Sequence, residues 1–210
     1  MKDISGLYLI TDESLINKED YFAIIDSVLI HRPKFIQLRA KDIDKKEILF
    51  KAKKIREISN KYNVKFIVND YLDVAIDSQA DGIHIGQSDE DYLNIKKEIG
   101  KDKIIGVSCY GDIERCIKFS ELGADYIAIG TPYFTKTKPS REKTPFSKMK
   151  EIVDRVQNTP IFAIGGIDGT NIDSIMDVGV NGVAVINSVF GSSTPSTSTL
   201  ELINILNKRI

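Results

Sequence analysis

Short segments rich in β-branched residues alternate with longer segments of helical period from one end of the chain to the other. Several short segments are apolar at nearly every position, as in IFAI at residues 161–164, which is typical of strands covered on both faces. Such strands pair in parallel. The sequence predicts eight of them, at residues 7–11, 34–38, 65–68, 82–85, 103–107, 126–129, 161–164 and 182–186.

Eight strand–helix units in 210 residues average about 26 residues each, somewhat below the roughly 31 of a typical closed barrel of this kind. We therefore expect an α/β protein with a compact (β/α)8 TIM barrel that spans residues 1–210 as a single domain. A doubly wound open sheet is the main alternative. It usually has fewer strands and often carries G-x-G-x-x-G after the first strand, and that motif does not follow residues 7–11.

Composition excludes several classes of protein. With 29 Lys and Arg against 30 Asp and Glu, the net charge of −1 gives no general attraction to nucleic acid or to an anionic membrane. No apolar run approaches the roughly 18 residues of a membrane helix, and the first residues lack the pattern of a secretory signal, so we expect a cytoplasmic protein. The sequence leaves open whether copies of the chain associate as a homo-oligomer.

Two helix starts are indicated by capping patterns. Asp44 followed by Glu47 resembles a capping box, and an apolar stripe begins at Ile48. Ser198 followed by Glu201 predicts the start of the last helix.

Polar residues follow the predicted strands, and the carboxyl ends of the strands carry the active site in a barrel of this kind. Asp70 and Asp89 follow neighbouring strands and form a candidate Mg2+ site. Mg2+ takes one or two protein carboxylates and completes its shell with water and substrate phosphates. Each aspartate also has an ordinary alternative role as the cap of the following helix.

Basic and glycine residues at the same end indicate two anion sites. Arg39, Lys41 and Lys138 suit a pyrophosphate, because they hydrogen-bond its oxygens and stabilise its charge as it departs. Each of the three taken alone could instead be a solvated charge at the rim. Gly165 and Gly166 let backbone N–H groups approach a phosphate after the seventh strand, although a double glycine also serves a turn into a helix. Two anion sites imply two substrates.

Other reactive side chains have ordinary structural interpretations. We expect His84, within GIHIG, to fill the barrel interior and His31 to lie at the surface. Cys109 is expected to pack as a small apolar residue. His31 and His84 are the only two histidines in the sequence, and neither has a partner at a strand end that would make a Ser-His-Asp arrangement.

The ordered motifs resemble those of the thiamine phosphate synthase family. Each segment alone is weakly informative, whereas their order from near the start of the chain to strand eight is specific. The matching segments are GLYLITD at residues 6–12, QLRAK at 37–41, FIVND at 66–70, ADGIHIGQSD at 80–89, GVSCYGD at 106–112, GADYIAIG at 123–130, TKTKP at 135–139 and AIGGI at 163–167.

The resemblance implies a transferase of thiamine biosynthesis that uses Mg2+. Such an enzyme joins 4-amino-5-hydroxymethyl-2-methylpyrimidine diphosphate to the nitrogen of 4-methyl-5-(2-phosphoethyl)thiazole carboxylate and releases pyrophosphate. By resemblance, Asp70 and Asp89 bind the metal. The implied pyrimidine diphosphate site is Gln37, Arg39, Lys41, Asn69, Ser108 and Lys138, of which Arg39, Lys41, Ser108 and Lys138 are catalytic. The implied thiazole phosphate site is Thr135, Thr137, Gly166, Ile186 and Asn187.

One position departs from the family pattern, and two related functions remain as alternatives. Members of the family commonly have Ser after the strand-eight Ile, where this chain has Asn187. A thiazole tautomerase of the same fold relies on a His just after strand five, where this chain has Ser108, Cys109 and Tyr110. A non-catalytic protein that binds thiamine precursors is expected to have lost metal ligands or Lys138, and this chain keeps them.

Overall fold

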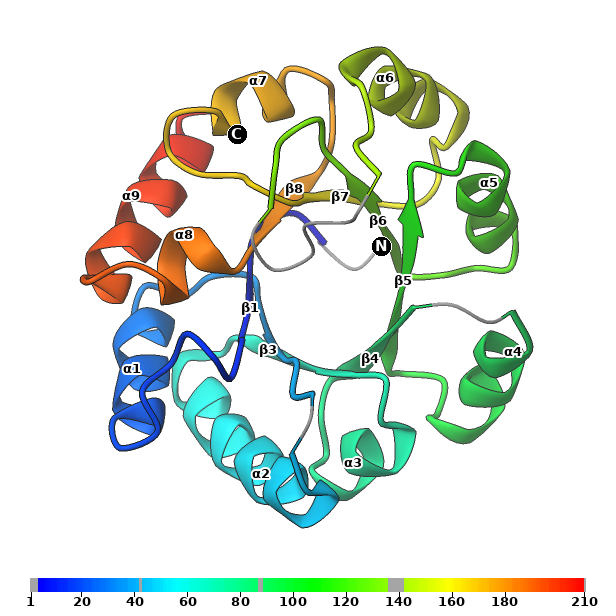
Figure 1. The fold of residues 1–210 in the computed structure, drawn as a ribbon. Helices are drawn as coiled ribbons and strands as arrows, with labels where there is room; N and C mark the ends of the chain where they lie inside the picture. The colour runs from blue at the N-terminus through cyan, green and yellow to red at the C-terminus, as the bar shows by residue number, and fades with distance from the viewer. Residues whose placement is uncertain (1–3, 42, 87–88, 136–141, 210) are drawn as a thin grey trace.

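A closed barrel of eight parallel strands forms the centre of the protein (Figure 1). The computed structural model describes residues 4–41, 43–86, 89–135 and 142–209, without the side chains of residues 89–91. The strands are hydrogen-bonded in chain order, and β8 pairs with β1 to close the barrel. They are β1 (Gly6–Ile10), β2 (Phe35–Leu38), β3 (Lys65–Asn69), β4 (Gly82–Ile85), β5 (Ile104–Tyr110), β6 (Tyr126–Gly130), β7 (Ile161–Ile164) and β8 (Gly182–Val185).

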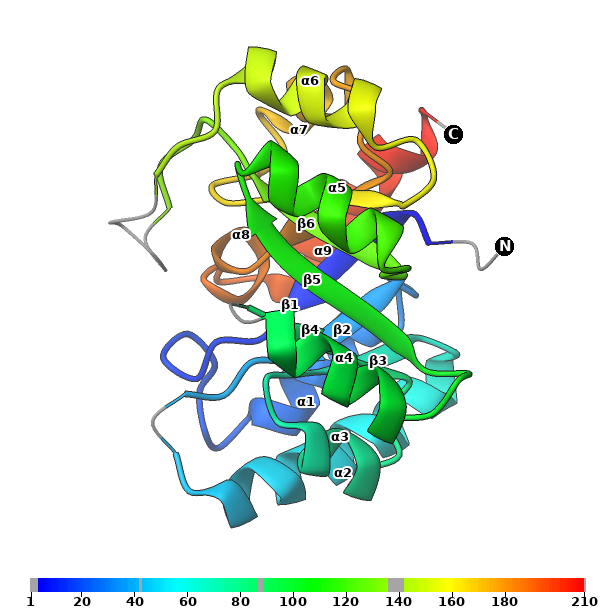
Figure 2. The same ribbon diagram turned by 90° about the vertical axis from the view of Figure 1, so that its right-hand side faces the viewer.

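Helices surround the barrel and cover the outer faces of its strands (Figures 1 and 2). This arrangement confirms the predicted (β/α)8 fold and excludes the open sheet. In the described residues, no helix combines the length and apolar character needed to cross a membrane. The helices are α1 (Tyr21–Leu29), α2 (Lys45–Tyr62), α3 (Leu72–Asp77), α4 (Asp89–Glu98), α5 (Ile113–Glu121), α6 (Phe146–Arg155), α7 (Ile172–Met176), α8 (Asn187–Phe190) and α9 (Pro195–Asn207).

Two layers of apolar side chains pack on the strands. The outer layer joins the strands to the helices. The inner layer includes the aromatic rings of Tyr8, Phe35, Tyr126 and Phe162, whose centroids lie 5.0 to 5.9 Å apart. These rings are almost completely buried, so the interior is a packed core rather than a pore.

The two helix starts expected from the sequence have different outcomes. Asp44 is the N-cap of α2, and its side chain accepts a hydrogen bond from the backbone N–H of Lys46. The last helix begins at Pro195, three residues before the predicted start at Ser198. Proline is suited to the first turn because its fixed φ is helical and the N–H that it lacks would have no partner there. The Ser198 hydroxyl instead lies 2.9 Å from the Ser192 hydroxyl.

Three of the even-numbered strands, β4, β6 and β8, share a structural device at the residue just before the strand. The side chain of each of these residues accepts a hydrogen bond from a backbone N–H at the start of the preceding strand. Its own backbone N–H donates to the carbonyl of that same strand residue. The pairs are Asp81 with Phe66, Asp125 with Ile105, and Asn181 with Ile161. The device fixes the register of neighbouring strands at the end of the barrel away from the predicted site.

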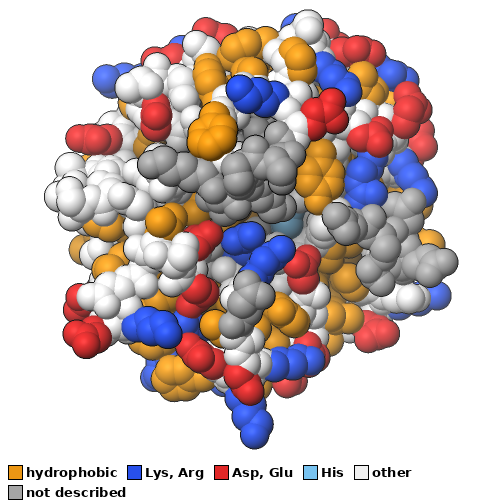
Figure 3. All heavy atoms as spheres, viewed as in Figure 1, with side chains coloured by type: hydrophobic (Ala, Val, Ile, Leu, Met, Phe, Trp, Pro, Cys, Tyr) orange, Lys and Arg blue, Asp and Glu red, His pale blue; other side chains and the backbone are white. Residues whose placement is uncertain are grey.

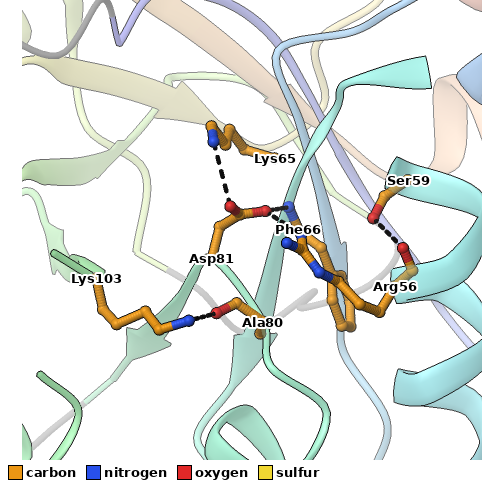
Figure 4. Close-up of polar contacts among 7 residues, drawn as sticks. All are labelled: Arg56, Ser59, Lys65, Phe66, Ala80, Asp81 and Lys103. Atoms are coloured by element: carbon orange, nitrogen blue, oxygen red, sulfur yellow. Dashed lines mark hydrogen bonds and ion pairs between the residues drawn. The ribbon is translucent and has the colours of Figure 1, made fainter. Parts of the chain in front are cut away.

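Asp81 also binds two basic side chains (Figure 4). Its Oδ2 accepts from the Phe66 N–H at 2.9 Å and from Arg56, and its Oδ1 lies 3.2 Å from the Lys65 ammonium. Burial acts to raise the pKa of Asp81, but the Phe66 N–H and the charges of Arg56 and Lys65 lower that pKa overall. The carboxylate therefore stabilises the fold in its ionised form.

Candidate active site

A cavity of about 900 Å3 opens at the carboxyl ends of the strands and receives side chains from the ends of all eight. Figure 3, which has the viewpoint of Figure 1, shows a central hollow with a histidine at its floor and Lys or Arg side chains beside it. The cavity brings together these residues of the predicted site: Gln37, Arg39, Lys41, Asn69, Asp70, Ser108, Thr135, Gly166, Ile186 and Asn187. Thr137 and Lys138, and the Asp89 side chain, lie outside the described residues.

Arg39 is held at the cavity wall from two directions. Its backbone N–H donates to the Thr11 hydroxyl at 3.1 Å, and its Nη1 lies 3.3 Å from Asp12 Oδ2. Both charged side chains are only 15% exposed, which limits the screening of this ion pair by solvent. The other Asp12 oxygen accepts from the Ser14 N–H and hydroxyl, so the carboxylate is itself fixed. Lys41 is exposed at the same rim.

Asp70 occupies a backbone conformation that non-glycine residues adopt rarely, with φ of 65°. Its N–H donates to the His84 carbonyl at 2.9 Å, which ties the end of β3 to β4. Asn69 Nδ2 donates to Asp70 Oδ2 at 2.6 Å. The side chain of Asp70 is exposed and lines the cavity. A rarely adopted φ that is held by a backbone hydrogen bond and that presents an exposed carboxylate is typical of a functional position.

The structure adds a buried hydrogen-bonded chain that crosses the barrel interior. Gln37 Nε2 donates to the Tyr8 hydroxyl at 2.7 Å, and the Tyr8 and Tyr126 hydroxyls are 2.7 Å apart. The Tyr126 hydroxyl lies 2.9 Å from His84 Nδ1, and His84 Nε2 lies 2.9 Å from the Ser108 hydroxyl. The chain thus connects two predicted substrate-binding residues, Gln37 and Ser108.

Sequence reasoning missed Tyr8 and Tyr126. The available signal was chemical: a tyrosine on a barrel strand buries its hydroxyl and must find a partner there. Burial raises the pKa of both phenols above the ordinary value, so both keep their protons. The prediction that His84 fills the interior is confirmed, since the residue is 8% exposed. Its ring also reaches the cavity wall.

Glycine at position 166 allows the loop after β7 to pack closely against the loop after β6 at the cavity wall. A Cβ on Gly166 would lie 2.2 Å from the Phe134 carbonyl oxygen, and its φ of 65° also favours glycine. Asn171 Nδ2 donates to the Gly166 carbonyl at 2.9 Å. The loop after β7 is therefore held against the loop that carries Thr135, and Ile186 and Asn187 face the same cavity from the end of β8.

Two reactive side chains lie away from the cavity. The His31 ring bonds the Ser196 hydroxyl at 2.8 Å, which joins the turn after α1 to α9. Cys109 is completely buried, as expected for a packing residue.

Comparison with known proteins decides the family. The model of the family described as thiamine monophosphate synthase matches residues 7–189. The chain belongs to this family. It is 37% identical over 202 residues to a thiamine-phosphate synthase of Clostridium tetani, which covers 96% of each chain. It is 38% identical over 189 residues to a thiamine-phosphate synthase of Clostridioides difficile, covering 90% of this chain and 89% of the relative.

A solved structure supports the same family assignment. The thiamine phosphate pyrophosphorylase from Pyrococcus furiosus superposes with a TM-score of 0.87 at 30% identity, covering 97% of this chain and 96% of that one. A 3-hexulose-6-phosphate synthase superposes with a TM-score of 0.71 at 15% identity, which shows a shared fold alone. The expectation of a transferase of the thiamine monophosphate synthase family is therefore confirmed.

Proposed function

We propose that this protein transfers the aminopyrimidinylmethyl group of a pyrimidine diphosphate to the nitrogen of a thiazole phosphate and releases pyrophosphate, giving thiamine phosphate. One observation carries the proposal: a single cavity gathers basic, amide, carboxylate and glycine groups, as a diphosphate and a phosphate substrate require. Its volume of about 900 Å3 lies within the range of small-molecule sites. The relatives that match most of the chain are named for this activity.

The basic groups are assigned to the diphosphate. Arg39 and Lys41 line one side of the cavity, and Arg39 is oriented by its ion pair with Asp12. In this role the guanidinium and the ammonium hydrogen-bond phosphate oxygens and stabilise the negative charge that grows as the carbon–oxygen bond breaks. Lys138 joins this set by its place in the family motif.

Asn69 and Ser108 lie on the wall between Arg39 and the loop after β6, and we assign both to the pyrimidine diphosphate. The electron-rich aminopyrimidine supports positive charge at its methylene carbon while the diphosphate leaves. The thiazole nitrogen then forms the new carbon–nitrogen bond. The reaction needs no general base, in agreement with the position of His84 in a bonded interior chain.

Asp70 fits a magnesium ion together with Asp89. The Asp70 carboxylate is exposed at the cavity, and its Oδ1 is 3.9 Å from the Cβ position of Gly86, which places it beside the end of β4. Within the described residues no group of three acidic, histidine or cysteine side chains forms a metal site. Mg2+ commonly binds through one or two carboxylates, with water and phosphates completing its shell. When bound, Mg2+ supplies positive charge that stabilises the leaving pyrophosphate.

Thr135, Thr137, Gly166, Ile186 and Asn187 are assigned to the thiazole phosphate. Gly166 and the end of β8 line the cavity from strands β7 and β8, whereas Arg39 follows β2, so the two proposed anion sites draw on different strand ends. The tautomerase alternative requires a histidine just after β5, and the chain has Ser108, Cys109 and Tyr110 there.

Formation of thiamine phosphate by Asp70→Ala, with Asp77→Ala as the matched control, tests the proposed site. Asp77 is exposed at the end of α3. We expect Asp70→Ala to lower turnover by on the order of 100-fold, as for the loss of one electrostatic stabiliser, and Asp77→Ala to match the wild type. A near-normal rate of Asp70→Ala at saturating Mg2+ would refute the metal role.

A further inference from the structure

Three residues of the hydrogen-bonded chain have no part in the proposed reaction. Tyr8, Tyr126 and His84 are buried between Gln37 and Ser108, and each contributes two polar contacts to the chain. Each contact is 2.7 to 2.9 Å long, within the range of a good hydrogen bond. If every hydrogen bond in this chain runs in the same direction, that direction decides whether Ser108 presents its hydroxyl proton or its lone pairs to the cavity.

The direction of the chain begins at Gln37. Its amide nitrogen can only donate, so the Tyr8 oxygen accepts. Tyr8 is fully buried and keeps its proton, and a buried hydroxyl proton needs an acceptor. Among the described residues of the protein, the acceptor within reach is the Tyr126 oxygen at 2.7 Å. Tyr8 therefore donates to Tyr126.

The same reasoning continues through the imidazole. Tyr126 also keeps its proton, and it donates that proton to His84 Nδ1 at 2.9 Å. A ring nitrogen that accepts carries no proton, so the proton of the neutral ring is on Nε2. Nε2 then donates to the Ser108 oxygen at 2.9 Å.

We propose that Gln37 sets one direction for the whole chain, which holds His84 as its Nε2–H tautomer and turns the Ser108 hydroxyl proton toward the cavity. Tyr8, Tyr126 and His84 are then positioning residues, because they act on substrate through Gln37 and Ser108. The direction of the hydrogen-bonded chain follows from these contacts and from the two protonated phenols, without reference to the reaction. Its value to the enzyme rests on the proposed function.

The direction matters because an anion binds beside Ser108 in the proposed reaction. A serine whose oxygen accepts from His84 has its own proton to donate to a phosphate oxygen. In the opposite direction Ser108 would donate to His84 and face the anion with lone pairs. At the other end, Gln37 keeps its carbonyl oxygen and its second N–H for the cavity, a donor and acceptor pair that matches an aminopyrimidine edge.

Nitrogen NMR of 15N-histidine-labelled protein measures the direction independently of activity. The protein has two histidines, His31 and His84. The His31→Gln variant, which changes a residue outside the cavity, therefore assigns the remaining signals to His84. The spectrum is recorded at about pH 8, above the ordinary pKa of histidine. We expect an unprotonated Nδ1 and a protonated Nε2. A proton on Nδ1, or on both nitrogens, overturns the proposal.

Gln37→Glu provides the reversing variant. An ionised carboxylate can only accept, so Tyr8 must donate to it and every later bond must turn round. The sample pH is raised until the 13C shift of the introduced carboxyl shows that it is ionised. We expect the His84 proton to move to Nδ1 in this variant. An unchanged tautomer overturns the role of Gln37.

Kinetics test whether the chain serves catalysis. Tyr126→Phe removes one hydroxyl from the chain, and Tyr92→Phe removes a buried hydroxyl that bonds the Leu122 carbonyl outside the barrel. We expect Tyr126→Phe to lower kcat on the order of 10-fold while the KM of the thiazole phosphate stays within about twofold, and Tyr92→Phe to match the wild type.

His84→Gln, which restores an N–H donor toward Ser108, should recover activity relative to His84→Leu. Equal kcat for Tyr126→Phe and the wild type, or equal kcat for the two His84 variants, removes the positioning role. A wild-type protein that forms no thiamine phosphate while the NMR results hold would instead defeat the proposed function and leave the direction of the chain intact.

Discussion

A Cβ on Gly106 would lie 1.9 Å from Cζ of Tyr126, so the phenol on β6 occupies the volume that a side chain on β5 would need. The glycine thereby fixes the Tyr126 hydroxyl within reach of both Tyr8 and His84. The buried chain thus depends on a residue that makes none of its hydrogen bonds.

Gly106→Ala is expected to displace Tyr126 and to break its contacts with Tyr8 and His84. Overpacking of a filled core costs about 1–3 kcal/mol, and we expect that loss in the free energy of unfolding together with a lower kcat. Denaturant unfolding and steady-state kinetics measure the two effects. Gly169→Ala is the control, because its Cβ would make an ordinary 3.7 Å contact with Ile205. Unchanged stability of Gly106→Ala would show that the phenol is not confined there.

Asp12→Asn is expected to weaken binding of the pyrimidine diphosphate. The amide can still accept from Ser14 but has no charge to hold the Arg39 guanidinium. We expect kcat/KM for this substrate to fall on the order of 10-fold, equivalent to about 1.4 kcal/mol. The exposed Asp20, changed to Asn, serves as the control. If only the stability of Asp12→Asn changes, Asp12 has no positioning role.

Asp81→Asn is expected to destabilise the fold in a pH-dependent way. The pKa of Asp81 is lowered in the folded state, so its stabilising contribution is present above the unfolded pKa of about 4 and is lost as the pH falls through the folded pKa. At neutral pH we expect a loss of about 1–3 kcal/mol, shrinking at acid pH. Thermal unfolding across pH measures it. Asp154→Asn, whose partner Lys150 is well exposed, should change stability by under about 0.5 kcal/mol. A deficit that does not vary with pH contradicts the assigned charge effect.

Asn187→Ser introduces the residue that the family pattern predicts at this position. The Asn187 Oδ1 lies 2.6 Å from the Cβ position of Gly191, so its side chain packs against the end of α8. We expect the KM of the thiazole phosphate to change less than about threefold, or about 0.6 kcal/mol, since the backbone N–H is retained. A tenfold lower KM in the variant would mean that a hydroxyl at this position binds the phosphate.

The fold was predictable because apolar strands and helical segments repeat along the whole chain. The boundaries of β5 were less predictable: the strand continues to Tyr110, where a bulge between Ser108 and Tyr110 shifts its register with β6. No local pattern signals such a bulge, because its cause is the pairing with a strand about 20 residues away.

The candidate site was predictable where a polar residue follows a strand, as with Arg39 and Asp70. Tyr8 and Tyr126 lie within strands and resemble ordinary core residues in the sequence. Their roles arise because closure of the barrel brings their hydroxyls to 2.7 Å across 118 positions of sequence. Asp12 was passed over for a similar reason, since its ion pair joins the loop after β1 to the end of β2.

The most direct test of the proposed function is the stoichiometry of products formed by the purified wild-type protein. Pyrophosphate and thiamine phosphate are measured together with both substrates and Mg2+, with each substrate omitted in turn, and with a chelator. We predict one pyrophosphate released per thiamine phosphate formed, and neither product when a substrate or Mg2+ is withheld. Pyrophosphate released from the pyrimidine diphosphate alone, or no product although both ligands bind, would contradict the assignment of this cavity to a synthase.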